Sequence, residues 1–329
     1  MSHRVLVRVP VNYHHPCPVT ALFDEAGVEA DYLPGSPPWP VEETRDLLEG
    51  QHGILAGGDY CNVEGLAKAG ELKVIARSGV GFDRIDVDLC TDRGIVLTTT
   101  QGALNDAVAD MAMALILAVV RRICQGDRTV KAGQFRITPT EELAVMTLGM
   151  VGCGRIGAAV TRRAAAFGMK LLVHDPYLEP GQVEELGAAS VELDELLAGS
   201  HVVSLHLPMT EESAGIVNAD FLGRMRKGSF LINTARGGLV DEEALIAALT
   251  EGHLAGAGLD VQATEPPVGR SQELVELENV VAMPHAASNT VTTRARMALW
   301  AARSIVEVLQ GKRPEHVVNR AVLEKLDLT

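Results

Sequence analysis

The chain has 329 residues, of which 47% are hydrophobic and 22% are charged. This composition is typical of a globular protein with about two domains and excludes a mainly disordered chain. The 43 acidic residues outnumber the 29 basic ones, and the net charge of −14 argues against nucleic acid and anionic membrane surfaces as partners.

The first hundred residues alternate short apolar strands with helical stretches. Strands are predicted near Arg4–Val9, Gly53–Ala56, Val74–Arg77 and Ile95–Thr98. Segment 33–40 must be a loop, because it is dense in proline. A long helix is then predicted over about Asn105–Ala132. Its apolar part, Met111–Val120, is too short to span a bilayer and is interpreted as a buried helix.

A clearer alternation follows from residue 148 onward. The predicted strands are Leu148–Val151, Lys170–His174, Val202–Leu207, Phe230–Asn233, Leu254–Val261 and Val280–Met283. Continuous apolar strands separated by helices are typical of a parallel sheet that is covered on both faces. Helices are expected over Arg155–Phe167, over about 241–251 and over Thr293–Gln310. The fold class is therefore α/β, with two doubly wound parallel-sheet domains.

Cysteine use and the N-terminus favour a cytoplasmic protein. The five cysteines are scattered and form no CxxC pair, which argues against a disulfide framework and a structural zinc site. The first residues lead directly into a strand pattern, without the apolar core of a signal peptide. His14 and His15 are interpreted as loop residues, and no metal is expected.

A glycine-rich turn, Gly152-Cys-Gly-Arg-Ile-Gly157, lies between a predicted strand and a predicted helix. In a dinucleotide-binding turn, Gly152 makes the tight bend, Gly154 lets the backbone approach a pyrophosphate, and Gly157 lets helix and strand pack closely. The bare pattern also fits a turn without a ligand. Asp175 ends the next strand, where a carboxylate binds ribose hydroxyls and repels a 2′-phosphate, so the combination favours NAD over NADP.

Three further polar residues follow strands of the same predicted sheet. Arg236 can hold a carboxylate through two parallel hydrogen bonds. Glu265 and His285 follow the next two strands, and a carboxylate beside an imidazole stabilises the imidazolium as a proton donor. Each residue alone has a structural explanation, but all three are expected at the sheet edge where ligands bind.

The ordered set of motifs resembles the D-isomer-specific 2-hydroxyacid dehydrogenases over almost the whole chain. The matching segments are 76–86, 107–122, 148–157, 204–208, 232–241, 258–267 and 284–285. The resemblance implies a flavodoxin-like substrate domain, 1–101 with 289–329, and an inserted Rossmann NAD domain, 102–288, which forms a homodimer. Small differences from the family pattern occur at Asp110, Phe135 and Val145-Met146.

The resemblance also implies roles for individual residues. Hydride passes between nicotinamide and a small 2-oxo acid, His285 supplies the proton, Glu265 tunes His285, and Arg236 binds carboxylate and carbonyl. Backbone amides around Ser78, Gly79 and Val80 bind the substrate carboxylate. The implied cofactor residues are Gly152, Gly154, Arg155, Ile156, Gly157, Asp175, Pro208, Thr234 and Asp260, the last of which contacts the carboxamide.

The loop Gly57-Gly58-Asp59 bears on the substrate. Phosphoglycerate dehydrogenases that resemble this chain present an Arg-Ser type sequence to the substrate phosphate at this position. Here Asp59 is expected to repel a phosphate, so a non-phosphorylated substrate is predicted. Tyr13, Trp39, Tyr60 and Phe82 are candidates for an aromatic wall.

Other activities remain open from the sequence. Phosphoglycerate dehydrogenase activity is one alternative. The chain also resembles the C-terminal binding protein corepressors, which sense NAD(H) and bind partner proteins. Oxidation of phosphite or formate is a third possibility, although the formate enzymes carry Gln at the position of Glu265.

Overall fold

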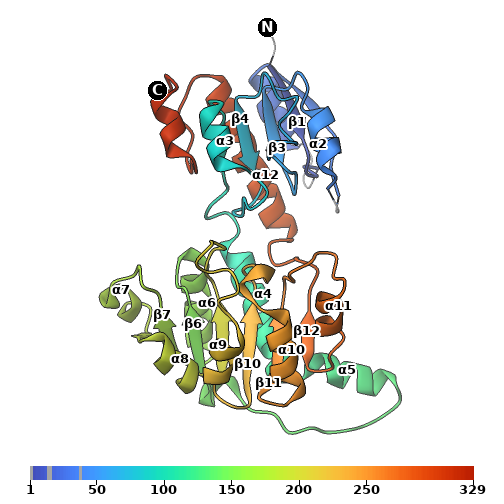
Figure 1. Cartoon of the computed structure of the whole chain (residues 1–329), viewed down its shortest axis with the longest axis vertical. Coiled ribbons are helices and arrows are strands. Elements are labelled where there is room, and N and C mark those ends of the chain that lie inside the picture. Colours follow the sequence, from blue (N-terminus) through green and yellow to red (C-terminus); the bar gives the residue numbers. More distant parts are fainter. Residues whose placement is uncertain (1–2, 13–16, 37–38) are drawn as a thin grey trace. The chain divides into compact units, whose positions relative to one another are not determined.

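The computed structural model describes residues 3–12, 17–36 and 39–329, so Tyr13, His14 and His15 lie outside the described residues. The chain forms two compact units (Figure 1). Unit 1 contains Met1–Leu104 and Asn289–Thr329, and unit 2 contains Asn105–Ser288. Unit 1 is thus built from both ends of the chain and unit 2 from its middle.

Unit 1 contains a five-stranded parallel sheet. The strands are β1 (His3–Val7), β2 (Val28–Tyr32), β3 (Gly53–Ala56), β4 (Val74–Arg77) and β5 (Val96–Thr98). Their order is β2-β1-β3-β4-β5, and neighbouring strands pair in parallel. This order is typical of flavodoxin-like folds, in which ligands bind outside the carboxyl ends of the strands.

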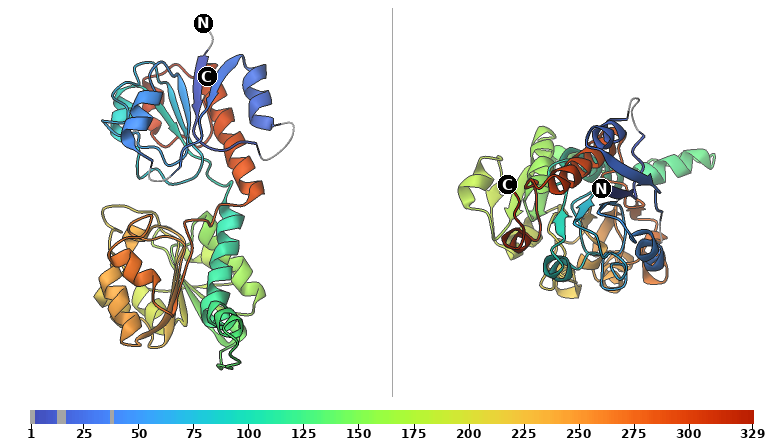
Figure 2. Two further views of the ribbon diagram at one scale, coloured as in Figure 1. Left: turned by 90° about the vertical axis from the view of Figure 1, so that its right-hand side faces the viewer. Right: turned by 90° about the horizontal axis from the view of Figure 1, so that it is seen from above.

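Helices cover both faces of this sheet (Figure 2). They are α1 (Pro18–Glu25), α2 (Val41–Leu47), α3 (Val87–Asp92), α12 (Val291–Leu309) and the 3₁₀ helix η3 (Arg320–Glu324). Because successive residues of a strand point to opposite faces, Val5 and Val7 pack in the apolar cluster with α1 and α12, whereas Leu6 packs in the opposite cluster. The sheet is therefore buried on both sides.

Unit 2 contains a seven-stranded parallel sheet. The strands are β6 (Thr147–Val151), β7 (Lys170–His174), β8 (Ala189–Ser190), β9 (Val202–Leu205), β10 (Ser229–Asn233), β11 (Leu254–Leu259) and β12 (Val280–Ala282). Their order is β12-β11-β10-β9-β6-β7-β8. The direction of winding reverses between β6 and β9, which is the switch point where Rossmann folds bind dinucleotides.

The helices of unit 2 also lie on both faces of its sheet. They are α4 (Asn105–Val120), α5 (Ile123–Lys131), α6 (Arg155–Ala166), α7 (Pro180–Glu184), α8 (Leu193–Gly199), α9 (Ala219–Arg224), α10 (Glu242–Thr250) and α11 (Arg270–Val275), with 3₁₀ helices η1 (Leu143–Val145) and η2 (Gly237–Leu239). One apolar cluster joins α4 and α6 to the sheet, and the other joins α8, α9, α10 and α11 to the opposite face.

The predicted fold class is confirmed, and every predicted strand is present with its ends shifted by a few residues at most. Two strands were missed. β2 carries the polar residues Glu29 and Asp31 at the edge of its sheet, and β8 has only two residues, so neither gives a continuous apolar signal. The helix predicted over Arg155–Phe167 is confirmed as α6, and its terminating Gly168 has φ 77°.

The single long helix predicted over about Asn105–Ala132 is wrong in part. The helix is interrupted at Arg122, whose φ of 52° is left-handed, and the chain becomes helical again in α5. α4 is held by its buried apolar residues, whereas α5 has no buried residue. Packing therefore fixes the direction of α4 alone, and the helical pattern of the sequence did not reveal the break.

The described part of the chain was searched for membrane-spanning helices, metal sites and disulfide bonds. No helix there is both long and apolar enough to cross a bilayer. No group of three or more potential metal-ligating side chains occurs among those residues. All five cysteines are free thiols, and only Cys124 is not buried.

Candidate active site

The glycine-rich turn after β6 has the geometry that close backbone approach requires. Gly152 has φ 85°, and a Cβ atom there would lie 2.8 Å from the carbonyl oxygen of His206. A Cβ atom on Gly157 would lie 2.7 Å from the carbonyl oxygen of Gly152. At Gly154 no atom lies within 4 Å of the equivalent position. Gly152 and Gly157 are thus needed for packing, and Gly154 leaves open space before α6.

Asp175, directly after β7, is fixed against this turn. Its Oδ2 accepts the amide of Cys153 at 2.7 Å, and its Oδ1 accepts the amide of Tyr177 at 3.0 Å. Burial raises the pKa of the Cys153 thiol, which argues for a packing role rather than a redox role. The carboxylate therefore lies beside the glycine turn at the switch point of the sheet.

Further polar groups lie at the carboxyl ends of β9 and β10. The hydroxyl of Thr234, after β10, is buried and has no hydrogen-bond partner among the described residues. His206, after β9, lies 2.8 Å through Nε2 from the Ser204 hydroxyl, and burial lowers its pKa to about 4. Pro208 follows on an exposed loop and accepts the Ser213 hydroxyl at 2.8 Å through its carbonyl. The Thr234 hydroxyl without a partner and the open space at Gly154 are both consistent with a bound dinucleotide.

Arg236 lies on the loop between β10 and η2. The Asn233 side-chain amide donates to the Arg236 carbonyl at 2.8 Å, which fixes the loop backbone. A Cβ atom on Gly237 would lie 1.9 Å from the carbonyl oxygen of Gln262, so this loop is pressed against the loop that follows β11. Because β10 and β11 are neighbouring strands, the close contact brings Arg236 to the same edge as Glu265.

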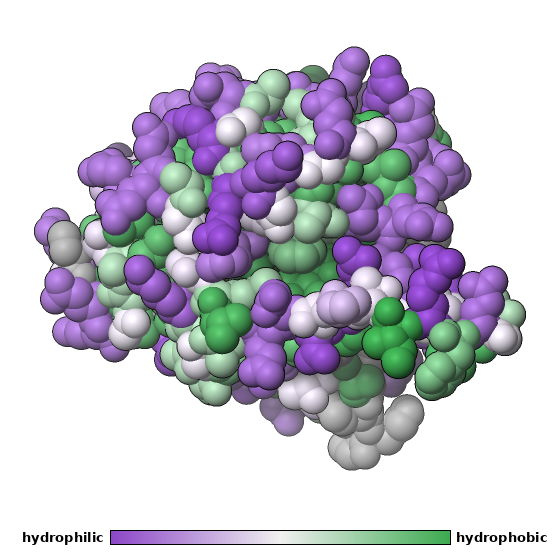
Figure 3. All heavy atoms as spheres, turned by 90° about the horizontal axis from the view of Figure 1, so that it is seen from below, coloured by the Kyte–Doolittle hydropathy of each residue, from purple (hydrophilic) through white to green (hydrophobic). Residues whose placement is uncertain are grey.

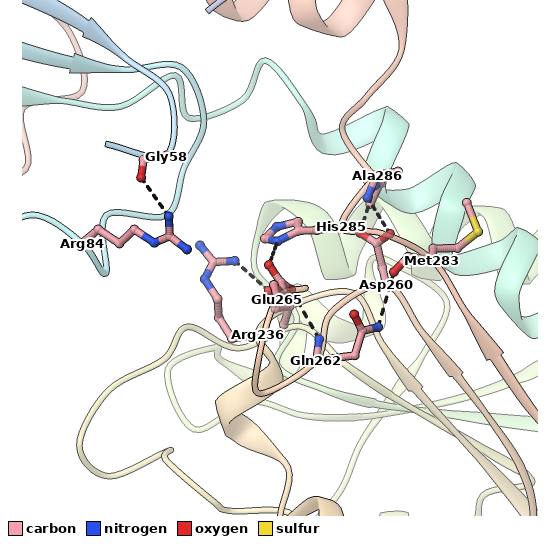
Figure 4. A network of polar contacts seen from close by, with 11 residues as sticks. Gly58, Arg84, Arg236, Asp260, Gln262, Glu265, Met283, His285 and Ala286 are labelled. Atoms are coloured by element: carbon pink, nitrogen blue, oxygen red, sulfur yellow. Dashed lines mark hydrogen bonds and ion pairs between the residues drawn. The ribbon is translucent and has the colours of Figure 1, made fainter. Parts of the chain in front are cut away.

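Glu265 and His285 form the predicted pair. His285 Nδ1 lies 2.8 Å from Glu265 Oε2 (Figure 4). The His285 side chain is 49% exposed, and its Nε2 has no partner among the described residues. Figure 4 shows the Arg236 guanidinium and the His285 imidazole on either side of the Glu265 carboxylate. The three side chains are therefore together at the carboxyl edge of β10, β11 and β12.

Asp260 holds the His285 loop in place. It follows β11 and is 1% exposed. Its Oδ1 accepts the amide of Ala286 at 2.8 Å, and its Oδ2 accepts the amide of Ala287 at 2.9 Å. Burial raises the pKa of Asp260, against the opposing effect of these two bonds. His285 itself has φ 52°, a left-handed conformation that a non-glycine residue adopts only when its surroundings impose it.

A second buried carboxylate supports the loop that carries Glu265. Glu242, in the first turn of α10, is 8% exposed. Its Oε1 accepts the amide of Ala263 at 2.9 Å, and its Oε2 accepts the Ser271 hydroxyl at 2.7 Å. Sequence reasoning missed this residue, because an acidic residue in the first helical turn is also explained by the helix dipole.

In unit 1, two of the three amides expected to bind a carboxylate are already used. The Ser78 amide donates to Ala56 at 3.0 Å, and the Gly79 amide donates to the Thr100 hydroxyl at 3.0 Å. The Val80 amide, and the Gly81 amide that sequence reasoning did not single out, have no partner among the described residues. Two consecutive amides are thus left at the carboxyl edge of β4.

The expected repulsion of a phosphate by Asp59 requires correction. Asp59 is buried, its Oδ1 accepts Arg8 Nε at 2.7 Å, and its Oδ2 accepts the Gly57 amide at 2.8 Å. Arg8 follows β1, next to β3 in the sheet, so a cation distant in sequence neutralises the carboxylate. The charge of Asp59 gives no reason to exclude a phosphorylated substrate.

Comparisons with known proteins agree with this geometry. The family model "D-isomer specific 2-hydroxyacid dehydrogenase, NAD binding domain" matches residues 113–287. A glyoxylate reductase of Korarchaeum cryptofilum is 43% identical over 272 residues, which are 81% of this chain and 82% of that protein. A D-3-phosphoglycerate dehydrogenase of Mycobacterium tuberculosis is 39% identical over 311 residues, 92% of this chain and 57% of that protein. The crystal structure of the TT0316 protein of Thermus thermophilus matches with a TM-score of 0.86 at 39% identity, covering 96% of this chain and 99% of that one.

Proposed function

Because the chain belongs to the D-isomer-specific 2-hydroxyacid dehydrogenase family and is an NAD-dependent 2-oxo acid reductase, we propose that its substrate is a small 2-oxo acid of the glyoxylate or hydroxypyruvate type. The observation that carries the proposal is the His285–Glu265 pair at 2.8 Å beside Arg236. The similarity to glyoxylate reductases over most of both chains supports the substrate size.

Each side chain of this trio has a chemical task. His285 engages Glu265 through Nδ1, so its Nε2 is the atom that gives a proton to the carbonyl oxygen during reduction and takes it back during oxidation. Glu265 orients the imidazole through its contact with Nδ1. Arg236 binds the substrate carboxylate and carbonyl oxygen with its planar guanidinium.

We place NAD at the switch point of unit 2. When bound there, NADH would supply hydride to the carbonyl carbon of the substrate. We assign the pyrophosphate to the turn Gly152–Gly157, with the backbone of Arg155 and Ile156 at the start of α6, and the adenine ribose to Asp175. We assign Thr234 and Pro208 to the remaining cofactor path, together with Asp260, whose buried carboxylate already accepts two backbone amides. The fixed Asp175 carboxylate favours NAD over NADP, since a 2′-phosphate would meet a negative charge.

Unit 1 is the proposed substrate domain. We assign the substrate carboxylate to the amides of Val80 and Gly81, which have no partner among the described residues and follow the engaged amides of Ser78 and Gly79. Unit 2 is the proposed NAD-binding and dimerisation domain. The free thiols and their burial fit the reducing cytoplasm, where we place the protein.

We propose a homodimer formed through α5 and the segment that follows it. Exposed apolar side chains include Phe135 at 89%, Ile137 at 83% and Val130 at 62%. Figure 3 shows hydrophobic side chains among hydrophilic ones on the face of unit 2 from which α5 extends. Phe135→Glu should shift the protein from dimer to monomer in sedimentation velocity. Tyr177→Glu, also at an 89% exposed position, is the matched control.

The substrate assignment is tested by NADH oxidation with a panel of 2-oxo acids, with NADPH in parallel. Glyoxylate, hydroxypyruvate, pyruvate and longer analogues cover the range of sizes, and 3-phosphohydroxypyruvate tests the phosphoglycerate dehydrogenase alternative. We expect turnover of a small unphosphorylated acid with NADH. Preference for the phosphorylated compound would overturn the substrate assignment, and tight NADH binding without any turnover would favour the NAD(H)-sensing alternative.

A further inference from the structure

A cation from the loop after β4 reaches the loop after β3. Arg84 Nη1 donates to the carbonyl of Gly58 at 2.9 Å (Figure 4). The guanidinium carbon lies 4.7 Å from the centre of the Tyr60 ring. The loop Gly57-Gly58-Asp59 contains no basic residue. Arg84, from the loop that follows the neighbouring strand β4, places a positive charge beside it.

No ion pair joins Arg84 to a carboxylate in the described part of the protein, and the residue is half-buried. Arg8, on the other side of the same loop, differs because its charge is balanced by Asp59 at 2.7 Å and Glu43 at 3.0 Å. A guanidinium has five N–H donors, so Arg84 retains donors beyond the one used by Gly58.

The space around this loop is bounded by an indole ring. Trp39 has φ 58°, and a Cβ atom on Gly57 or Gly58 would lie 2.6 Å from atoms of its ring. Arg8 lies 5.7 Å from the ring centre. The indole ring is therefore packed against the two glycines of the loop.

Arg84 also lines a pocket of about 340 Å³ at the carboxyl edge of the unit 1 sheet. The other lining residues are Tyr60, Asn62, Asp83, Ile85 and Asp86. The lining includes one cation and two carboxylates, so an uncharged oxygen substituent suits it better than a second full negative charge. Val80 and Gly81, the proposed carboxylate donors, precede Arg84 in the same loop.

We infer that Arg84 is a specificity-determining residue that donates to an oxygen on C3 of the substrate, so that a 3-hydroxy-2-oxo acid is preferred over an unsubstituted one. The inference rests on the proposed function, because it takes the 2-oxo acid end of the substrate to lie at Val80 and Gly81. The preferred substrate class is therefore a 2-oxo acid that is hydroxylated at C3.

The test compares kcat/KM for hydroxypyruvate and pyruvate, which differ by one hydroxyl group. The wild type should prefer hydroxypyruvate, and Arg84→Met should lower that preference at least tenfold. Arg84→Lys should retain part of it, since a lysine keeps the charge but loses the planar donor set. Arg93→Met is the matched control, because Arg93 also donates to a carbonyl of unit 1, that of Leu66 at 2.7 Å, and lies on another loop.

The outcomes separate the two claims. An equal fall of kcat/KM for both substrates in Arg84→Met, or a wild type that prefers pyruvate, would overturn the inference and leave the reductase assignment intact. Absence of turnover with every 2-oxo acid would overturn the proposed function itself. If oxaloacetate or 3-phosphohydroxypyruvate shows the largest loss in Arg84→Met, the distal group is an anion and the hydroxyl assignment is wrong. Unchanged tryptophan fluorescence confirms that the variant is folded, because both tryptophans, Trp39 and Trp300, lie in unit 1.

Discussion

The backbone amide of His285 donates to the carbonyl oxygen of Asp260 at 2.8 Å, and the carboxylate of Asp260 accepts the next two amides. One buried residue thus fixes three successive amides of the loop that carries the proposed proton donor. The left-handed φ of His285 is maintained by this arrangement. The position of the imidazole is therefore determined from the strand β11 as well as from Glu265.

Asp260→Asn should loosen this loop, because a side-chain NH₂ group would face the amide of Ala286 or Ala287 in place of an acceptor. An unsatisfied buried amide costs about 1–3 kcal/mol. We expect a lower thermal midpoint and a kcat reduced about tenfold or more. Thermal unfolding and steady-state kinetics measure the two effects. A variant with unchanged kcat and stability would contradict the positioning role.

Glu265→Gln removes the negatively charged partner of His285 while keeping the side-chain size. The rate of reduction should fall about tenfold or more, because an amide that can donate as well as accept no longer orients the imidazole through Nδ1 alone. The measurement is kcat/KM in both directions, with NADH binding as the control. A variant with the kcat/KM of the wild type would contradict the proposed coupling.

Gly237→Ala tests the contact between the Arg236 and Glu265 loops. The new Cβ atom would lie 1.9 Å from a backbone oxygen, so the loops must separate. Overpacking of this kind costs about 1–3 kcal/mol or more, and kcat/KM should fall with stability. Gly223→Ala, in α9 with no atom within 4 Å of the added group, is the control and should be neutral or slightly stabilising. Equal behaviour of the two variants would show that the contact is unimportant.

His206 gives a prediction for stability against pH. Its pKa is about 4 in the folded protein and 6.5 when unperturbed. Between these values the unfolded chain binds a proton that the folded protein does not, so His206 lowers the free energy of unfolding as pH falls from 6.5 towards 4. His206→Gln should show a shallower loss in this window, followed by circular dichroism during urea unfolding because both tryptophans lie in unit 1. Parallel pH curves for variant and wild type would refute the assignment.

The sequence predicted the parts of this protein that local patterns encode. The glycine turn, Asp175 and the three polar residues after strands were identified because each follows a recognisable apolar strand. The neutralisation of Asp59 by Arg8 and the anchoring of His285 by Asp260 were missed, since both depend on residues brought together by the fold. The break at Arg122 was also missed, because the helical pattern continues across it while burial stops.

The proposed function requires His285 to transfer the proton in an NADH-dependent reduction of a small 2-oxo acid. Its most direct test is the rate of NADH oxidation with hydroxypyruvate or glyoxylate by the wild type and by His285→Ala, with NADH binding measured in both. We expect clear wild-type turnover and a loss of about 10²–10⁴-fold in the variant, while NADH binds both proteins with similar affinity. A variant that retains most of its kcat/KM would contradict this role of His285.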